Sequence, residues 1–319
     1  MKKTLTLLII TLCVFFASCS SLLDDSGKIY WIDNPLDHEI TVKIDDAEHK
    51  IAPKSSIKVK IEYGTHELSY DGQKVKFIAK PCFSLVVLNP TLSNYISYAE
   101  IYYYSDSDAA TDRGERLLNS FSQDYDFGDG VIEKVPFRVF NSFIIEGYVG
   151  KWDYDLDTSL PEEIVTNVAK GVNLSADMKI KLFREEEFIE FIGEDLGLQR
   201  PKITKLDDLA PQQVIDEEYL SFDCEKAQPI GDSLKVYINK LYTTSGKEFS
   251  EAYKFFTSID ENRKNLHLRL FTPELQLDCN KSYDQKNGGG LSDPNYMANE
   301  MGINEALSNF QNINAWIVK

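Results

Sequence analysis

Apolar and polar residues alternate in the first third of the chain, and this alternation restricts the fold more than any other feature. Residues 40–44 read Ile-Thr-Val-Lys-Ile, and residues 57–61 read Ile-Lys-Val-Lys-Ile. Successive side chains of a strand point to opposite faces of a sheet, so each segment is predicted to be a strand with one buried face. Asp71-Gly72 lies before a further strand and is typical of a hairpin turn. These signals predict a small β-sandwich over residues 28–104.

The remainder of the chain has a mixed pattern. Residues 105–130 are rich in Asp, Ser and Gly, which indicates a linker or long loop with a short helix around residues 113–121. Residues 131–319 are predicted to form an α+β domain. Its expected helices cover residues 161–172, 185–196, 249–259 and 298–310, and its expected strands lie within residues 135–149, 179–183, 234–238, 266–270 and 315–318. The predicted fold class is an N-terminal all-β sandwich-like module followed by an α+β domain.

The N-terminus has the features of an export signal. Lys2 and Lys3 precede an apolar run over residues 5–16, which is too short to cross a bilayer of about 30 Å as a helix. Ala17-Ser18-Cys19 follows the run at once. This order resembles the signal of bacterial lipoproteins, in which small residues precede a Cys that receives lipid and becomes the first residue of the mature chain. Ordinary cleavage near Ser20 would instead leave no lipid.

The resemblance implies a cellular location and a lipid anchor. Residues 1–18 would be the signal peptide, Cys19 would carry palmitate-type acyl chains, and residues 19–27 would be a short tether. Ser20 after the Cys, rather than Asp, implies the outer membrane in a Gram-negative cell. Residues 42–46 and 61–66 resemble the small envelope β-modules of PEGA type, without their signature tetrapeptide.

Charge restricts the partners of the chain. The 319 residues carry a formal net charge of −17. Nucleic-acid binding requires clustered positive charge, so this class of partner is excluded. Electrostatic attachment to anionic lipid is disfavoured for the same reason, which leaves the N-terminal lipid as the predicted contact with the membrane. An acidic surface favours a protein partner with a basic face.

Three Cys residues remain after the signal and the lipid site are removed. Cys224 and Cys279 follow similar sequences, Phe-Asp and Leu-Asp, and each ends a strand-like run. An oxidising envelope permits disulfides, so we predict a bridge between these two residues. Cys82 precedes an apolar run and is expected to be a buried free thiol.

Asp153, Asp155 and Asp157 form the strongest candidate for a metal site. Alternate carboxylates in a loop can converge on Ca²⁺, which prefers oxygen ligands. An EF-hand loop would need Gly and Glu where this chain has Thr158 and Ile164. The alternative is a solvated acidic loop. A second acidic cluster contains Asp124, Asp126 and Asp129.

Other chemical motifs are weak. The four His residues lack metal-ligand spacing and are expected at the surface: His38, His49, His66 and His267. Ser55-Ser56-Ile57-Lys58 fits Ser-x-x-Lys without its companion motifs. Tyr102-Tyr103-Tyr104 are either ordinary strand aromatics or part of a recognition face.

Two functions from different classes remain. The first is a membrane-tethered, non-enzymatic envelope lipoprotein that acts by protein–protein contact, as an assembly accessory, an adhesin-like protein or an immunity factor. The alternative is an envelope hydrolase that uses carboxylates of the C-terminal domain, with Asp153, Asp155, Asp157 and Glu162 as candidates.

Overall fold

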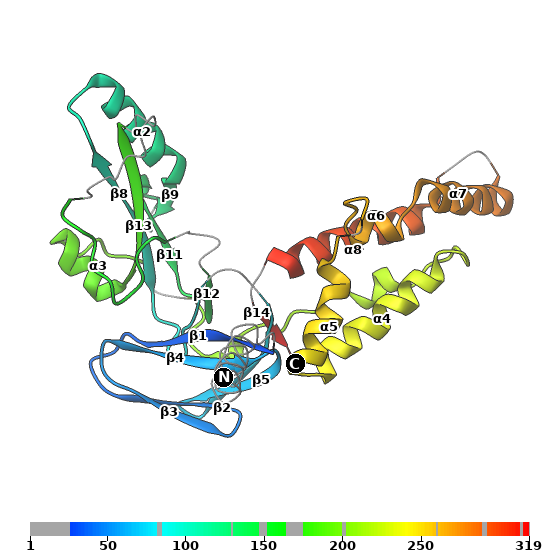
Figure 1. Cartoon of the computed structure of the whole chain (residues 1–319), viewed down its shortest axis with the longest axis horizontal. Coiled ribbons are helices and arrows are strands. Elements are labelled where there is room, and N and C mark those ends of the chain that lie inside the picture. Colours follow the sequence, from blue (N-terminus) through cyan, green and yellow to red (C-terminus); the bar gives the residue numbers. More distant parts are fainter. Residues whose placement is uncertain are drawn as a thin grey trace, which may run out of the picture.

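The computed structural model describes residues 26–81, 85–128, 130–146, 152–163, 175–199, 202–259, 261–288, 292–312 and 315–318. The predictions for Cys19, Cys82 and Asp129, and most of the expected helix over 161–172, lie outside these residues. In Figure 1 the β-sandwich lies at the bottom, a second sheet with its helices rises on the left, and helices extend to the right.

Two sheets face each other in the sandwich, but its limits differ from the predicted 28–104. Residues 144–146 and 315–318 supply two of its strands, whereas the strand over residues 95–103 belongs to another sheet. One sheet has the order β12-β7-β1-β4 and the other β14-β6-β5-β2-β3. Their shared core contains Tyr30 and Ile32 from the first sheet and Val42, Leu68 and Phe77 from the second. The strands are β1 (Gly27–Asn34), β2 (Ile40–Ile44), β3 (Ala47–Ile51), β4 (Ser55–Glu62), β5 (Gly64–Tyr70), β6 (Gln73–Ala79), β7 (Val86–Leu88), β12 (Ile144–Glu146) and β14 (Ala315–Val318).

A separate three-stranded sheet, called the second sheet below, lies outside the sandwich. It has the order β11-β8-β13, with β8 (Tyr95–Tyr103), β11 (Phe137–Phe140) and β13 (Ala176–Arg184). Helices α2 (Asp108–Phe121) and α3 (Glu185–Ile192) pack against it, and β9 (Gln123–Asp126) pairs with β10 (Ile132–Val135).

Helix α2 lies in the stretch that the sequence predicted to be a linker or loop. The Ser107 side chain accepts a hydrogen bond from the Ala110 amide and so caps the helix. At Gly114 an added Cβ would come within 2.5 Å of the Tyr103 hydroxyl, so the missing side chain permits close packing on β8. The helix predicted around residues 113–121 is therefore confirmed and begins earlier.

The C-terminal part is rich in helices that share one apolar core. The core includes Leu234, Ile238, Phe249, Phe256 and Phe310. The expected helices over 249–259 and 298–310 are confirmed here, and the helix expected over 185–196 is present as α3 but ends at Ile192. The elements are η2 (Leu206–Asp208), η3 (Glu217–Leu220), α4 (Gln228–Thr243), α5 (Gly246–Thr257), α6 (Leu266–Leu270), α7 (Pro273–Asn287) and α8 (Pro294–Asn312).

Two predicted strands are helices instead. Residues 234–238 lie in α4, where Leu234 and Ile238 are buried one turn apart and Val236 is 56% exposed. Two apolar residues four positions apart satisfy both the strand period and the helix period, so three residues could not distinguish them. Residues 266–270 form α6, which begins where the Asn265 side chain accepts from the Leu268 amide.

The last strand, which the sequence predicted as part of the α+β domain, instead returns to the sandwich. In the antiparallel pairing of β14 with β6, Trp316 lies opposite Ile78 and Ile317 opposite Phe77. Ile317 packs on the sandwich core, whereas Trp316 belongs to the helical core. The strand thereby joins the two cores through the two faces of one sheet.

The predicted disulfide is present. Cys224 and Cys279 are bridged over a sequence separation of 55 residues, and both are buried in the helical core. Their setting differs from the prediction, because Cys279 lies within α7 and Cys224 lies in the turn before α4. The bridge ties α7 to the N-terminal end of α4.

Replacing both bridged residues, Cys224→Ala with Cys279→Ala, should lower the free energy of unfolding by about 2–4 kcal/mol, because the unfolded chain regains the freedom that the cross-link removes. Urea unfolding followed by circular dichroism measures the change. Reductant should destabilise the native protein to a similar extent and leave the double variant unaffected. Equal stability of the two oxidised proteins would contradict the prediction.

Candidate functional site

The predicted metal loop directs its carboxylates to separate partners. Asp153 Oδ2 accepts from the Ile180 amide at 2.9 Å, and Asp155 Oδ1 accepts from the Thr158 hydroxyl at 2.7 Å. Asp157 binds Arg184 and also accepts from the Ser56 hydroxyl at 2.6 Å. In this structure the three carboxylates therefore do not converge on one point. Within the described ranges no group of three or more His, Cys, Asp or Glu side chains is placed to hold a metal ion.

A cation of the protein itself occupies this loop. Lys181 Nζ donates to the main-chain oxygens of Asp155 at 2.8 Å, Leu156 at 3.3 Å and Thr158 at 2.7 Å. The residue is buried, and this burial lowers the pKa of Lys181. Loop oxygens that could have coordinated a metal ion therefore bind an ammonium group.

Arg184 and Asp33 form a buried ion pair beside the loop. The pair joins the end of β13 to β1, with Arg184 2% exposed and Asp33 fully buried. Arg184 Nη2 lies 2.6 Å from Asp33 Oδ1, and Tyr95 donates its hydroxyl to Asp33 Oδ2 at 2.6 Å. Glu187 holds the Nη1 edge of the guanidinium at 2.6 Å. Burial raises the pKa of Asp33, although Arg184 and Tyr95 oppose this by hydrogen bonding.

The His residues differ from their predicted surface positions in two cases. His66 is only 12% exposed, with Nδ1 2.7 Å from Asp45 Oδ2 and Nε2 2.7 Å from the Glu62 carbonyl. Both ring nitrogens are thereby engaged. His267 lies in α6 rather than on a strand, and its side chain is 19% exposed near Glu300.

The tyrosine cluster and the second acidic cluster make contacts that stabilise their own part of the fold. Tyr102 donates its hydroxyl to the Pro161 carbonyl at 2.7 Å. Tyr103 packs on Gly114 of α2. Asp126 accepts from the Gly128 amide at 2.8 Å in the turn after β9.

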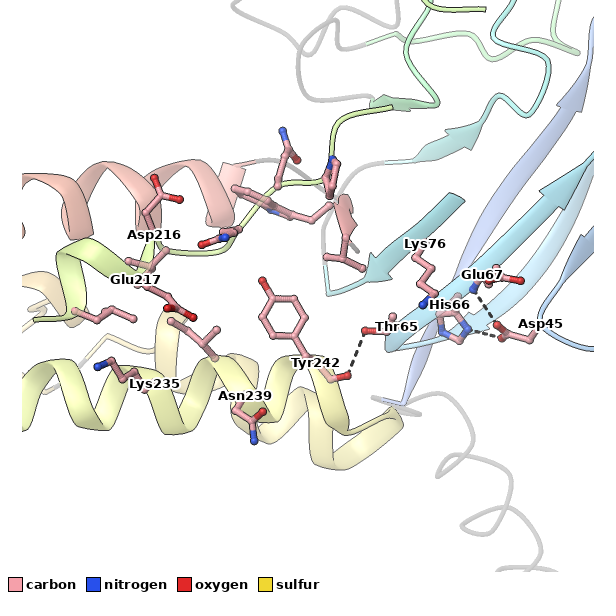
Figure 2. A pocket seen from close by; sticks show the side chains of 18 residues that line it. Asp45, Thr65, His66, Glu67, Lys76, Asp216, Glu217, Lys235, Asn239 and Tyr242 are labelled. Atoms are coloured by element: carbon pink, nitrogen blue, oxygen red, sulfur yellow. Dashed lines mark hydrogen bonds and ion pairs between the residues drawn. The ribbon is translucent and has the colours of Figure 1, made fainter. Parts of the chain in front are cut away.

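A large groove lies between the sandwich and the helical part (Figure 2). Its volume is about 1400 Å³. One wall is formed by β5, β6 and β14, and the other by α4 and the segment that precedes it. The lining residues are Asp45, Thr65, His66, Glu67, Lys76, Pro211, Gln212, Gln213, Ile215, Asp216, Glu217, Leu220, Lys235, Ile238, Asn239, Tyr242, Trp316 and Val318.

The sheet wall follows from strand alternation. Register places Glu67 opposite Lys76 and Lys76 opposite Val318, so these three side chains lie in a row across β5, β6 and β14. Thr65 and Trp316 flank Ile78 in the neighbouring row. This is the face of the sheet turned away from the sandwich core.

The helix wall presents one side of α4. Ile238 and Tyr242 lie one turn apart, and the Tyr242 hydroxyl accepts from the Val214 amide at 3.2 Å. The preceding segment is fixed to the sheet wall, because the Gln212 amide donates to the Ile317 carbonyl at 2.7 Å. In Figure 2 Tyr242 rises from α4 between Glu217 and Thr65.

The rim of the groove carries charges of both signs. Glu67 is paired with Lys74 at 2.6 Å, and Asp45 with His66. Two acidic residues, Asp216 and Glu217, and two basic residues, Lys76 and Lys235, make no ion pair with any other residue that the structure describes. Local sequence patterns do not predict this site, because its residues come from separate segments between positions 45 and 318.

Comparison with known protein families, curated proteins and solved structures finds no match to this chain. Among the helices in the described part, none is long and apolar enough to cross a membrane.

Asp33→Asn should lower the free energy of unfolding by about 3–5 kcal/mol, because Arg184 would remain buried without the Asp33 carboxylate, which is its fully buried partner. Urea unfolding measures the effect. Asp37→Asn is the matched control, since the Asp37 side chain is exposed, and it should leave stability unchanged within error. Similar behaviour of both variants would show that the buried pair does not hold the sheets together.

Lys181→Met should destabilise the protein by about 1–3 kcal/mol, because the loop carbonyls would lose their donor. Lys50→Met, on the exposed part of β3, is the control. The melting temperature of the unaltered protein should not change when EDTA is added, because Lys181 already occupies the loop. A fall in melting temperature with EDTA would instead support a bound metal ion.

Proposed function

We propose that this chain is a membrane-tethered envelope lipoprotein that acts by protein–protein contact, with the groove as its contact surface. The groove is the main support for this proposal, because it combines an apolar floor with a charged rim, as protein-binding surfaces do. Ile215, Leu220, Ile238 and Val318 supply apolar surface. Asp216 supplies part of the rim.

The start of the described chain lies beside the groove. Ser26 accepts from the Tyr63 amide at 2.8 Å, and Tyr63 accepts from the Gly246 amide at 2.7 Å. Thr65, two residues later, lines the groove next to Tyr242. Residues 19–25 can span at most about 25 Å when extended. A lipid on Cys19 would therefore keep this end of the groove close to the bilayer.

The net charge of −17 supports a partner with a basic face, whose approach the acidic chain would accelerate. An assembly accessory, an adhesin-like protein and an immunity factor all fit this description. The hydrolase alternative gains no support from the groove, because Asp153, Asp155, Asp157 and Glu162 do not line it.

The anchor is tested first. Intact-mass measurement of the protein from native membranes should show loss of residues 1–18 and added acyl mass on Cys19, because this is how lipoprotein signals are processed. Cys19→Ser should release the protein from the membrane fraction. A mass that retains Met1, or an unmodified thiol at Cys19, would overturn the proposed location.

The contact surface is tested in the same cells. A photo-crosslinking amino acid at Asn239, in the groove, should give a discrete adduct in intact cells because a partner would lie within reach. The same amino acid at Lys50, on the opposite edge of the sandwich sheet, is the control. Absence of a groove-specific adduct would contradict the proposed function.

A further inference from the structure

We infer that the groove binds an extended polypeptide segment of its partner, with an apolar anchor flanked by a basic and an acidic side chain. This inference rests on the proposed function and specifies the chemistry of the contact. Four observations support a peptide: the size of the groove, the sign and position of its unpaired charges, a buried donor in its wall, and an open strand edge at its rim.

The size of the groove favours a polypeptide segment over a small molecule. Small-molecule sites occupy about 300–1,000 Å³ and enclose most of their ligand. The groove of about 1400 Å³ exceeds this range. It also runs along two secondary-structure elements, α4 and the β5–β6–β14 sheet, as a chain segment would require (Figure 2).

The charges specify both ends of the segment. Asp216 and Glu217 lie together at one side of the groove, before and within η3, whereas Lys76 lies on the sheet at the other side (Figure 2). Lys235 lies on α4. A basic side chain of the segment would meet the acidic pair, and an acidic side chain would meet Lys76. The apolar floor between them would receive the anchor.

Two main-chain features favour an extended conformation. The main-chain amide and carbonyl groups of Glu67 point away from β6. The amide donates to Asp45 Oδ1, and the carbonyl accepts from the Asp45 amide. Alternation gives Thr65 the same direction. Strand β2 pairs with β5 only from Leu68 to Tyr70, so no described strand lies beside Thr65 on that side. An added strand could bind this edge.

A buried donor in the wall gives an independent indication. Trp316 is 5% exposed, and its indole Nε1 has no hydrogen-bond partner in the part of the chain that the structure describes. A buried donor without an acceptor is unfavourable. Trp316 lines the groove, and main-chain carbonyls of an extended peptide are acceptors of the kind that this donor lacks.

The test uses a displayed library of random dodecapeptides, selected on the purified protein without its signal and lipid. We expect enriched peptides with an apolar residue between a basic and an acidic residue. Asp216→Lys with Glu217→Lys should weaken the dissociation constant of an enriched peptide about tenfold or more in fluorescence anisotropy. Glu225→Lys with Glu251→Lys, at exposed positions outside the groove, is the matched control and should bind normally.

A peptide whose basic residue is changed to Glu should regain affinity for the Asp216→Lys, Glu217→Lys protein, since the charges are then exchanged. Circular dichroism and urea unfolding establish that this variant is folded. The inference fails if no peptide is enriched, or if the groove and control variants bind equally. In that case a groove-specific crosslink at Asn239 would still support contact with a folded surface, so the proposed function would survive.

Discussion

The buried ion pair between Arg184 and Asp33 connects two sheets that are joined by no strand pairing among the described residues. Arg184 ends β13 of the second sheet, and Asp33 lies on β1 of the sandwich. Tyr95 of β8 adds a hydrogen bond to the same carboxylate, and Asp157 brings the acidic loop to the same guanidinium. Removing two charges from water is unfavourable unless their hydrogen bonds are well formed, and here Tyr95, Glu187 and Asp157 complete the hydrogen bonds of the pair.

A second connection places the helical part. β14 has one face toward each core, with Ile317 on the sandwich and Trp316 on the helices. The helices must therefore pack on the outer face of the sheet to which β14 belongs. The groove is the part of this face that α4 and the segment around Gln212 leave uncovered. Its position at the junction follows from the return of the chain to β6.

Local rules predicted much of the fold. Strand alternation at residues 40–44 and 57–61 identified strands of the sandwich, and the apolar stripe over residues 185–196 identified α3. Local rules did not distinguish the helix α4 from a strand, because Leu234, Val236 and Ile238 fit both periods. The groove could not be predicted at all, since its walls meet only after β14 pairs with β6.

The acidic loop shows why a carboxylate pattern alone does not identify a metal site. Asp153, Asp155 and Asp157 have the spacing of oxygen ligands, but residues far along the chain decide their partners. The strand β13 brings Lys181 and Arg184 to the loop, where they take its main-chain oxygens and the Asp157 carboxylate. A cation that is fixed on a neighbouring strand loses no translational freedom when it binds the loop, whereas a dissolved ion does. The protein's own ammonium and guanidinium groups therefore compete effectively with a dissolved ion for such a loop.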